Sequence, residues 1–247
     1  MIRELAAAFM LLTRLPVGRW AGSTPPGPAR CFWAYPVVGA AVGAIAGGVY
    51  ALLHRAGAPP WVAACWTVAA SVLVTGALHE DGLADMADGF GGGSTVARKL
   101  EIMRDSRVGS YGVLALVFAV GVRVSAVATL AAPSLVATAL IAAGALSRGA
   151  LVIPILLLAP AREDGLASGL RRREPGRALL GLMLALFITM LAVLKPAAAV
   201  AAVVASLAAA FGTAALARAQ IGGYTGDVLG ACAVVVECVA LSVLASI

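Results

Sequence analysis

The chain has 247 residues, of which 62% are hydrophobic and only 12% are charged, so it is far more apolar than a soluble globular domain and belongs in a lipid bilayer. Aromatic residues make up only 6%, whereas Ala, Gly, Leu and Val dominate, which favours an all-α bundle of closely packed helices over an outer-membrane barrel with aromatic girdles. The formal net charge of +6 does not indicate nucleic-acid binding, because the basic residues are spread over short loops, and the four cysteines form no CxxC pair that would indicate zinc.

The first segment, Ile2 to Leu15, is too short to span a bilayer and carries Arg3, Glu4 and Arg14. It lacks a cleavable signal pattern, and we expect an interfacial or re-entrant helix that packs on the others. Seven later stretches are apolar over about 20 residues, the length that a spanning helix needs. They are residues 35–53, 61–78, 111–130, 134–158, 178–194, 197–216 and 228–247. The sequence therefore predicts a polytopic transmembrane helical bundle that forms one integral membrane domain, residues 1–247.

The basic residues predict the orientation of this bundle. The N-terminal segment and the loops 79–110, 159–177 and 218–227 share one side and hold 14 of the 18 Lys and Arg residues, with 11 of the 12 acidic residues. The opposite side has only Arg55 and Lys195, and the run from Arg171 to Arg173 reads as a topology signal. Because positive charge marks the cytoplasmic side, we expect these loops and any chemistry to face the cytoplasm.

Three ionisable residues, Arg123, Arg148 and Glu237, fall inside predicted spans at a matched depth of roughly 15–18 Å, at a rise of 1.5 Å per residue. A charge in hydrocarbon costs about 2.5–3.5 kcal/mol on insertion scales, so such side chains face a bundle interior or a polar cavity. The matched depth predicts pairing. A structural ion pair and a grip on an anionic substrate both account for it.

The most informative segment runs from His79 to Gly93 and reads HEDGLADMADGFGGG. Asp81, Asp85 and Asp88 occur at i, i+4 and i+7, which places them within an arc of about 60° on one helix face. Like charges so placed repel one another, so the pattern favours a bound divalent cation, and hard oxygen ligands select magnesium, manganese or calcium. A solvated acidic face is the alternative. Gly91 and Gly92 allow backbone amides to approach a phosphate, although glycine runs are also ordinary hinges.

Two further cytoplasmic segments carry candidate site residues. In the first, Arg104 and Arg107 lie one helical turn apart and are candidates for gripping phosphate oxygens, while Asp105 is a candidate metal ligand or base. Arg98 and Lys99 instead suit a headgroup anchor. The second segment reads GGYTGD from Gly222 to Asp227; Gly223 permits close backbone approach, and Thr225 or Asp227 is suited to cap the helix that follows. Such a helix N-terminus also favours anions.

With these motifs in place, the chain resembles the cobalamin synthase family, the adenosylcobinamide-GDP ribazoletransferases, over nearly its whole length. The likeness rests on LTRLP at residues 12–16, GALHEDGLADMADG at 76–89, MRDSRVGSYG at 103–112 and GGYTGD at 222–227. Two small departures are Glu80, at a variable position, and Arg123, where a lysine is usual.

The resemblance implies a magnesium-dependent membrane enzyme of the cell inner membrane, which joins adenosylcobinamide-GDP to α-ribazole or its 5′-phosphate and releases GMP. Asp81, Asp85, Asp88 and Asp227 would hold the metal, and Arg104 and Arg107, with Gly91, Gly92, Gly223 and Thr225, would bind substrate phosphates. Asp81, Asp85, Asp105 and His79 are the catalytic candidates. His79 is a candidate base because neutral imidazole accepts a proton near pH 7, but it projects away from the aspartate face, and an aspartate serves equally well.

Two other functions stay open at this point. A CDP-alcohol phosphotransferase also uses clustered aspartates, but its spacing of DG, AR and two further aspartates is not present. A secondary transporter would explain Arg123, Arg148 and Glu237 as an ion pathway. Oligomeric state is open as well: the resemblance allows a homo-oligomer or an association with other enzymes of B12 assembly, besides the substrates and the membrane lipids.

Overall fold

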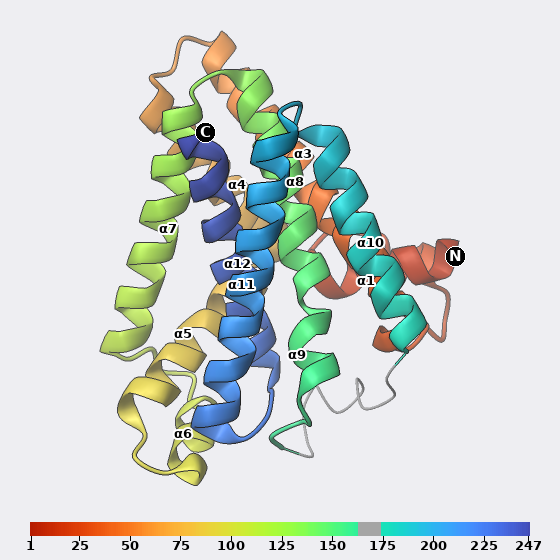
Figure 1. Cartoon of the computed structure of the whole chain (residues 1–247), viewed down its shortest axis with the longest axis vertical. Helices are drawn as coiled ribbons and strands as arrows, with labels where there is room; N and C mark the ends of the chain where they lie inside the picture. The colour runs from red at the N-terminus through yellow and green to blue at the C-terminus, as the bar shows by residue number, and fades with distance from the viewer. Residues whose placement is uncertain (163–173) are drawn as a thin grey trace.

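The computed structural model of the chain describes residues 1–162 and 174–247, and all regular elements in these ranges are helices (Figure 1). Two short elements, α2 (Gly18–Ala21) and the 3-10 helix η1 (Pro28–Ala34), follow the N-terminal helix α1 (Ile2–Leu12). The others are α3 (Tyr35–Arg55), α4 (Pro60–Thr75), α5 (Leu78–Gly92), α6 (Val96–Ile102), α7 (Ser110–Leu130), α8 (Pro133–Ala150), α9 (Val152–Leu157), α10 (Pro175–Ala192), α11 (Pro196–Ile221) and α12 (Gly226–Ser246). The run from Arg171 to Arg173 lies outside the described residues.

Six of the described helical stretches are long and apolar enough to cross a membrane. They are η1 with α3, α7, α8 with α9, α10, α11 and α12, and they match six of the seven predicted spans. The seventh, predicted as residues 61–78, is α4, which is followed by α5 at an angle of 91°. The prediction of a polytopic all-α membrane bundle is confirmed, and the segment treated as a loop, 79–110, contains two helices.

The break between α4 and α5 lies at Gly76 and Ala77, whose φ angles are 66° and 57°. Two consecutive residues in the left-handed region cannot continue a right-handed helix, so the chain turns sharply there. The side chain of Arg14 packs against Gly76, where an added Cβ would collide with it, and the Arg14 amide donates to the Val74 carbonyl at 2.7 Å. The segment after α1 thereby holds the break in place.

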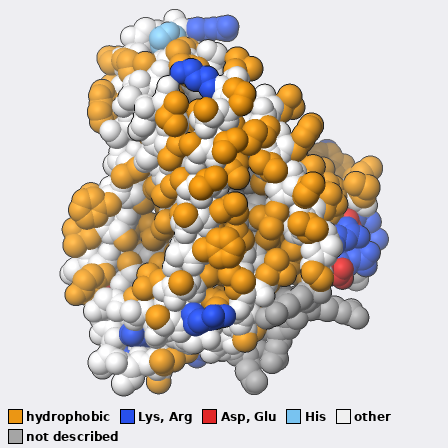
Figure 2. Space-filling model, in the orientation of Figure 1, with side chains coloured by type: hydrophobic (Ala, Val, Ile, Leu, Met, Phe, Trp, Pro, Cys, Tyr) orange, Lys and Arg blue, Asp and Glu red, His pale blue; other side chains and the backbone are white. Residues whose placement is uncertain are grey.

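Helix α8 lies at the centre of the bundle, where α3, α10 and α12 surround it (Figure 1). Its backbone meets that of α3 directly, because Gly39 faces Gly144 and Gly43 faces Leu140 with no room for a Cβ. Such contacts between small residues are the usual way in which helices associate in lipid. Large apolar side chains of α4, α7, α10 and α11 point outward instead, and hydrophobic side chains cover the middle of the face drawn in Figure 2. The described surface is therefore suited to hydrocarbon.

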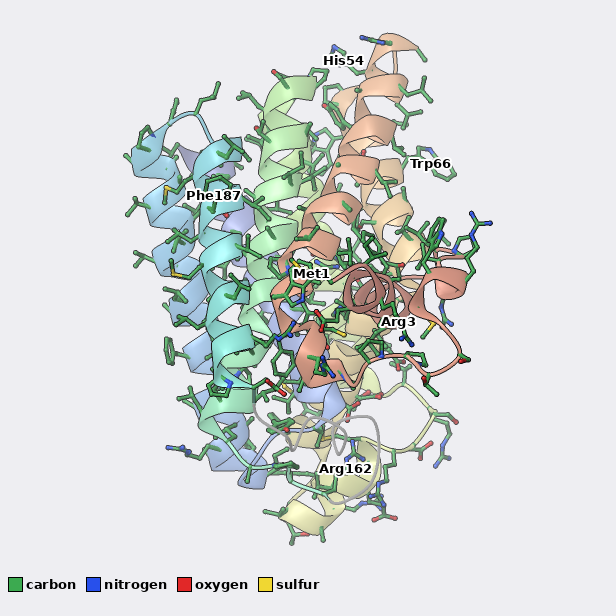
Figure 3. All side chains as sticks on the ribbon, turned by 90° about the vertical axis from the view of Figure 1, so that its right-hand side faces the viewer. Met1, Arg3, His54, Trp66, Arg162 and Phe187 are labelled. Carbon is green, nitrogen blue, oxygen red and sulfur yellow. The ribbon has the colours of Figure 1, made fainter. Side chains whose placement is uncertain are left out.

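The N-terminal helix packs on the others, as predicted, and lies across the direction of the spanning helices (Figure 3). Its buried Glu4 accepts a hydrogen bond from the Trp33 indole at 3.0 Å and pairs with Arg177 at the start of α10 at 2.7 Å. A buried carboxylate is stable only with such partners. These bonds fix α1 against η1 and α10, so that α1 forms one wall of the cavity described below.

Candidate active site

The acidic residues of α5 lie in three different environments. Asp81 is exposed, Asp85 is half-buried and Asp88 is buried. Within the described residues, Asp81 and Asp85 form no ion pair or hydrogen bond with another side chain, whereas the negative charges of Asp81, Asp88 and Asp227 all act on the Asp85 carboxylate. The helical arrangement predicted for the three aspartates is therefore present, and it gathers negative charge with little compensation.

Asp227 joins this group because α5 and α12 cross at very short range. A Cβ at Gly82 would lie 2.9 Å from the Asp227 carbonyl oxygen, and one at Gly230 would lie 3.1 Å from the His79 carbonyl oxygen. Only glycine allows two backbones to approach this closely. The crossing brings Asp81 and Asp227 to the same cavity. Residues nearly 150 positions apart in sequence thus contribute carboxylates to one place.

The segment before α12 is held by backbone hydrogen bonds to the segment after α9. Tyr224 forms a short parallel bridge with Pro160: its amide donates to the Ala159 carbonyl at 2.9 Å, and its carbonyl accepts from the Ala161 amide at 2.8 Å. Position 223 requires glycine, because a Cβ there would collide with the Ala159 carbonyl. Thr225 is the N-cap of α12 and accepts from the Val228 amide at 3.2 Å. The predicted role of Thr225 as a helix cap is therefore enough to explain why its hydroxyl is buried.

The same bridge places Arg162, which was not predicted as a site residue, beside the acidic site. Arg162 follows the bridged residues, and its guanidinium donates to the Asp227 carboxylate at 2.6 Å. Arg162 also opposes the negative charges that act on Asp85. The signal in the sequence was weak, because Arg162 belongs to a loop in which the run of three arginines stood out.

Asp88 has a different set of contacts from the other acids. One carboxylate oxygen accepts from the Gly109 amide at 2.7 Å and the other from the Gly112 amide at 2.9 Å. These are the N-cap and third residues of α7, so Asp88 satisfies donors that every helix N-terminus leaves unpaired. The contacts identify Asp88 as an anchor that holds α5 to the start of α7.

Arg107 is paired with its neighbour rather than with the acidic face. Its guanidinium donates to both oxygens of Asp105, at 3.0 Å to Oδ1 and 2.6 Å to Oδ2, and the bonds from Arg107 hold the pKa of that carboxyl at about 2. Such a weakly basic carboxylate is a poor general base near neutral pH. Arg104 is exposed. The role of both arginines as phosphate ligands stays a prediction.

Gly91 and Gly92 lie in the last turn of α5, about 15 Å along the helix axis from Asp81 at 1.5 Å per residue. A Cβ at Gly91 would lie 2.6 Å from the Tyr111 ring, so this glycine lets α5 pack against the start of α7. The described structure does not bring these glycines to the position of Asp81. Their part in phosphate binding also stays a prediction.

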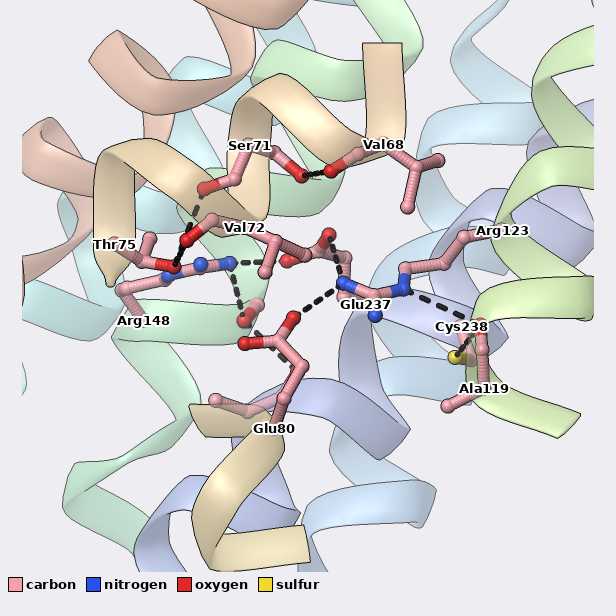
Figure 4. Close-up of polar contacts among 12 residues, drawn as sticks. Val68, Ser71, Val72, Thr75, Glu80, Ala119, Arg123, Arg148, Glu237 and Cys238 are labelled. Atoms are coloured by element: carbon pink, nitrogen blue, oxygen red, sulfur yellow. Dashed lines mark hydrogen bonds and ion pairs between the residues drawn. The ribbon is translucent and has the colours of Figure 1, made fainter. Parts of the chain in front are cut away.

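A buried charge network joins α5, α7, α8 and α12 (Figure 4). Arg123 pairs with Glu80 at 2.7 Å and with Glu237 at 3.6 Å, and Arg148 pairs closely with Glu237. The predicted pairing of Arg123, Arg148 and Glu237 is thus present, with Glu80 as a fourth member that the sequence analysis treated only as a variable position. One signal did exist: two buried arginines facing a single glutamate require a second anion. The network balances two positive charges with two negative ones.

His79 is 3% exposed, lies near the network and lines the cavity beside Asp81. Neither of its ring nitrogens has a hydrogen-bond partner among the described residues. A general base must come within hydrogen-bond reach of the proton that it accepts. Both nitrogens are buried, although His79 lines the same cavity as Asp81, and its role as a base stays a prediction.

Metal binding can be judged from the donor set. No group of three or more His, Cys, Asp or Glu side chains in residues 1–162 and 174–247 lies close enough to hold a metal ion. Magnesium, however, is usually held by one or two carboxylates, several waters and the phosphates of a substrate. Asp81 and Asp85, neither of which forms an ion pair with a described side chain, fit that mode of binding, with Asp227 beside them.

The sequence of the chain is similar to a family model and to curated proteins of one named activity. The family model described as cobalamin-5-phosphate synthase matches residues 4–245. Among curated proteins named adenosylcobinamide-GDP ribazoletransferase, that of Bradyrhizobium diazoefficiens is 43% identical over 93% of this chain and 88% of its own length. That of Mesorhizobium japonicum is 40% identical over 99% and 93%, and that of Azorhizobium caulinodans 42% over 93% and 90%. No solved structure matches the chain.

Proposed function

The chain belongs to the cobalamin-5-phosphate synthase family, and on that premise we propose that it joins adenosylcobinamide-GDP to α-ribazole, or to its 5′-phosphate. It is a multi-pass membrane transferase of cobalamin synthesis. In the proposed reaction a ribose hydroxyl of α-ribazole attacks the phosphorus attached to cobinamide. The new ribose O–P bond forms as the bond to the second phosphate breaks, so adenosylcobalamin, or its 5′-phosphate, and GMP are the products.

The observation that carries this proposal is the pair of carboxylates on α5, Asp81 and Asp85, which form no ion pair with a described side chain; Asp81 lines a cavity that Asp227 also lines. A diphosphate substrate is strongly anionic, so carboxylates alone would repel it. Magnesium bound by these aspartates would neutralise charge on the phosphates and on the leaving GMP. The acidic site therefore suits a metal-dependent phosphoryl transfer.

The aspartates have a second task, because a ribose hydroxyl is a weak nucleophile. We propose that the carboxylate of Asp81 or Asp85 accepts the proton of this hydroxyl. A general base must lie within hydrogen-bond reach of the reacting group, and a substrate bound at the acidic site would meet that condition. Arg162 is placed to contact phosphate oxygens from the rim of the site, provided that it leaves Asp227. Asp88 would support the reaction by holding α5 rather than by contacting substrate.

We place the protein in the inner membrane with this site on the cytoplasmic side. Excess Lys and Arg in the N-terminal segment and in the loops beside α5, α6 and α12 supports that orientation. An association with a second copy or with other enzymes of B12 assembly stays a prediction.

Secondary transport is the competing proposal from another class, because it would use the buried charges as an ion pathway. Those charges pair with one another in the structure, which supports a static role. A transporter would depend most on Arg123, Arg148 and Glu237, whereas the transferase should depend most on Asp81 and Asp85.

The test is release of GMP by the purified protein in lipid nanodiscs, given adenosylcobinamide-GDP and α-ribazole with magnesium or with EDTA. GMP and a cobalamin formed in equal amounts, only with both substrates and only with metal, are the expected result. Turnover that persists in EDTA would overturn the metal assignment alone. No turnover by folded protein would overturn the transferase, and counterflow of labelled substrates would then test transport.

A further inference from the structure

The acidic site opens onto an apolar cavity of about 240 Å³ that the reaction chemistry does not by itself explain. Its walls include Leu12 of α1, Tyr35 of α3, Leu151 and Ile155 around α9, and Leu229 of α12. Asp81 and Asp227 stand at the same cavity. The lining thus combines an apolar interior with carboxylates, which suits a ligand with one apolar part and one polar part.

The size of the cavity limits which part of which substrate it can hold. Cavities that enclose drug-sized ligands measure about 300–1,000 Å³, so 240 Å³ accommodates a small ring system and excludes a corrinoid. The guanine of adenosylcobinamide-GDP would fit by volume, but its ring carries several donors and acceptors. Buried polar groups without partners cost about 1–3 kcal/mol each, so an apolar cavity disfavours guanine.

Resting on the proposed function, we propose that this cavity binds the aromatic base of α-ribazole, 5,6-dimethylbenzimidazole. In α-ribazole one ring nitrogen of that base is bonded to the ribose, so the base is a flat bicyclic ring with two methyl groups, no N–H donor and one free ring nitrogen. Apolar walls match the ring and its methyl groups, and the unpartnered imidazole of His79 offers the one donor that the free nitrogen needs after a turn of the ring. The attached ribose then extends toward Asp81.

This placement gives the N-terminal segment a role. Leu11 and Leu12 of α1 line the cavity, and α1 is held in place by the buried Glu4 and its partners. The crosswise helix therefore closes the base-binding cavity on one side, which explains why a segment too short to span the membrane packs against the acidic site.

The first experiment measures binding of α-ribazole, and of the analogue that carries unsubstituted benzimidazole as its base, to the protein in nanodiscs by equilibrium dialysis. One methyl-sized group in an apolar pocket is worth about 10–200-fold in discrimination, so loss of both methyl groups should weaken binding at least tenfold. Ile155→Phe fills the cavity and should weaken binding of α-ribazole by more than tenfold. The matched control is Leu157→Phe, two residues away on α9, where the side chain is 44% exposed; binding should match that of the wild type.

In the turnover assay, Ile155→Phe should raise KM for α-ribazole at least tenfold and leave KM for adenosylcobinamide-GDP within about twofold. Equal base binding by Ile155→Phe, Leu157→Phe and wild type would overturn the proposal, as would a rise in KM for adenosylcobinamide-GDP alone. If Ile155→Phe does not fold, Leu11→Trp at the half-buried edge of the cavity serves instead, and the methyl series on wild-type protein needs no variant. Base binding without GMP release would overturn the transferase but keep the cavity assignment, and GMP release without selective base binding would do the reverse.

Discussion

At the scale of single residues, the aspartates of α5 differ in what they contact. Asp81 and Asp85 form no ion pair or hydrogen bond with another described side chain, whereas both carboxylate oxygens of Asp88 accept hydrogen bonds. The difference comes from the start of α7, whose amides occupy the Asp88 carboxylate. A contact between segments 21 residues apart leaves no periodic signal, so the sequence cannot separate an anchor from a metal ligand.

Asp81→Asn and Asp88→Asn should therefore fail in different ways. Asp81→Asn should lower turnover by about 100-fold or more, because it removes a metal ligand or base, and it should melt at the same temperature or slightly higher, because it relieves repulsion. Asp88→Asn should lower the free energy of unfolding by about 1.5–3 kcal/mol, because it weakens two hydrogen bonds to a charged acceptor. GMP release and thermal melting of both variants are the measurements. Unchanged stability in Asp88→Asn would contradict the anchor role.

Glu80 and Arg123 offer a test of the buried network. Removing one partner of a buried pair costs about 3–5 kcal/mol, because an uncompensated charge stays buried. Glu80→Gln and Arg123→Gln should each destabilise the protein strongly, whereas the double variant keeps Arg148 balanced by Glu237 and should lose less than the sum of the two. The measure is the fraction of protein that stays monodisperse after heating in detergent. Additive losses would show that the two charges act independently.

The low pKa of Asp105 leads to a prediction for the pH dependence of kcat/KM. Its bonds from Arg107 lower the pKa to about 2, so the carboxylate is charged throughout pH 5–9 and any stabilisation that it gives is lost only as the pH falls through about 2. Asp105→Asn should therefore leave the shape of the kcat/KM profile between pH 5 and 9 unchanged. A limb of the profile that disappears in this variant would instead identify Asp105 as a titrating base.

At the scale of elements, hydropathy predicted six spans well because each is a long, apolar helix. It extended the seventh to Leu78, whereas α4 ends at Thr75. The turn between α4 and α5 depends on the positive φ angles of Gly76 and Ala77, and hydropathy does not predict backbone angles. Alanine at positive φ costs roughly 1–2 kcal/mol, which the packing of Arg14 and of α5 must offset. The sequence signal for this turn is Gly76, the left-handed C-cap of α4, because glycine commonly ends a helix; a count of apolar residues does not detect it.

Substitution of Gly76 tests this turn. Gly76→Ala should destabilise the protein by about 1–2 kcal/mol and reduce turnover, because φ is +66° and the added Cβ would displace Arg14. Gly48→Ala on α3 is the matched control, since nothing lies within 4 Å of its added Cβ, and it should melt at the same temperature or slightly higher. Equal melting of the two variants would remove the argument that this turn is constrained.

At the scale of the whole molecule, the distribution of Lys and Arg in the sequence and the arrangement of the helices both distinguish two ends of the bundle. His54 lies at one end of the bundle and Arg162 at the other (Figure 3), and the acidic site lies toward the end where α5, α6 and the segment before α12 meet. The sequence predicted which segments share a side, but it gave no sign that Arg162 would bind Asp227 or that α1 would wall a cavity. Those contacts depend on how helices cross, and a linear pattern of hydropathy does not encode crossing.

Orientation in the membrane follows from the same division and can be measured directly. In a background with the exposed Cys65 replaced by Ala, a cysteine is introduced either at Ala56, in the turn after α3, or at Ser94, between α5 and α6; both positions are exposed. A membrane-impermeant maleimide should label Ala56→Cys in intact spheroplasts, and Ser94→Cys only after lysis, because the Lys- and Arg-rich side stays in the cytoplasm. The reverse labelling pattern would put Asp81 and Asp85 outside, where cytoplasmic nucleotide substrates do not reach them, and it would overturn the proposed transfer even if the fold and the acidic site are as described.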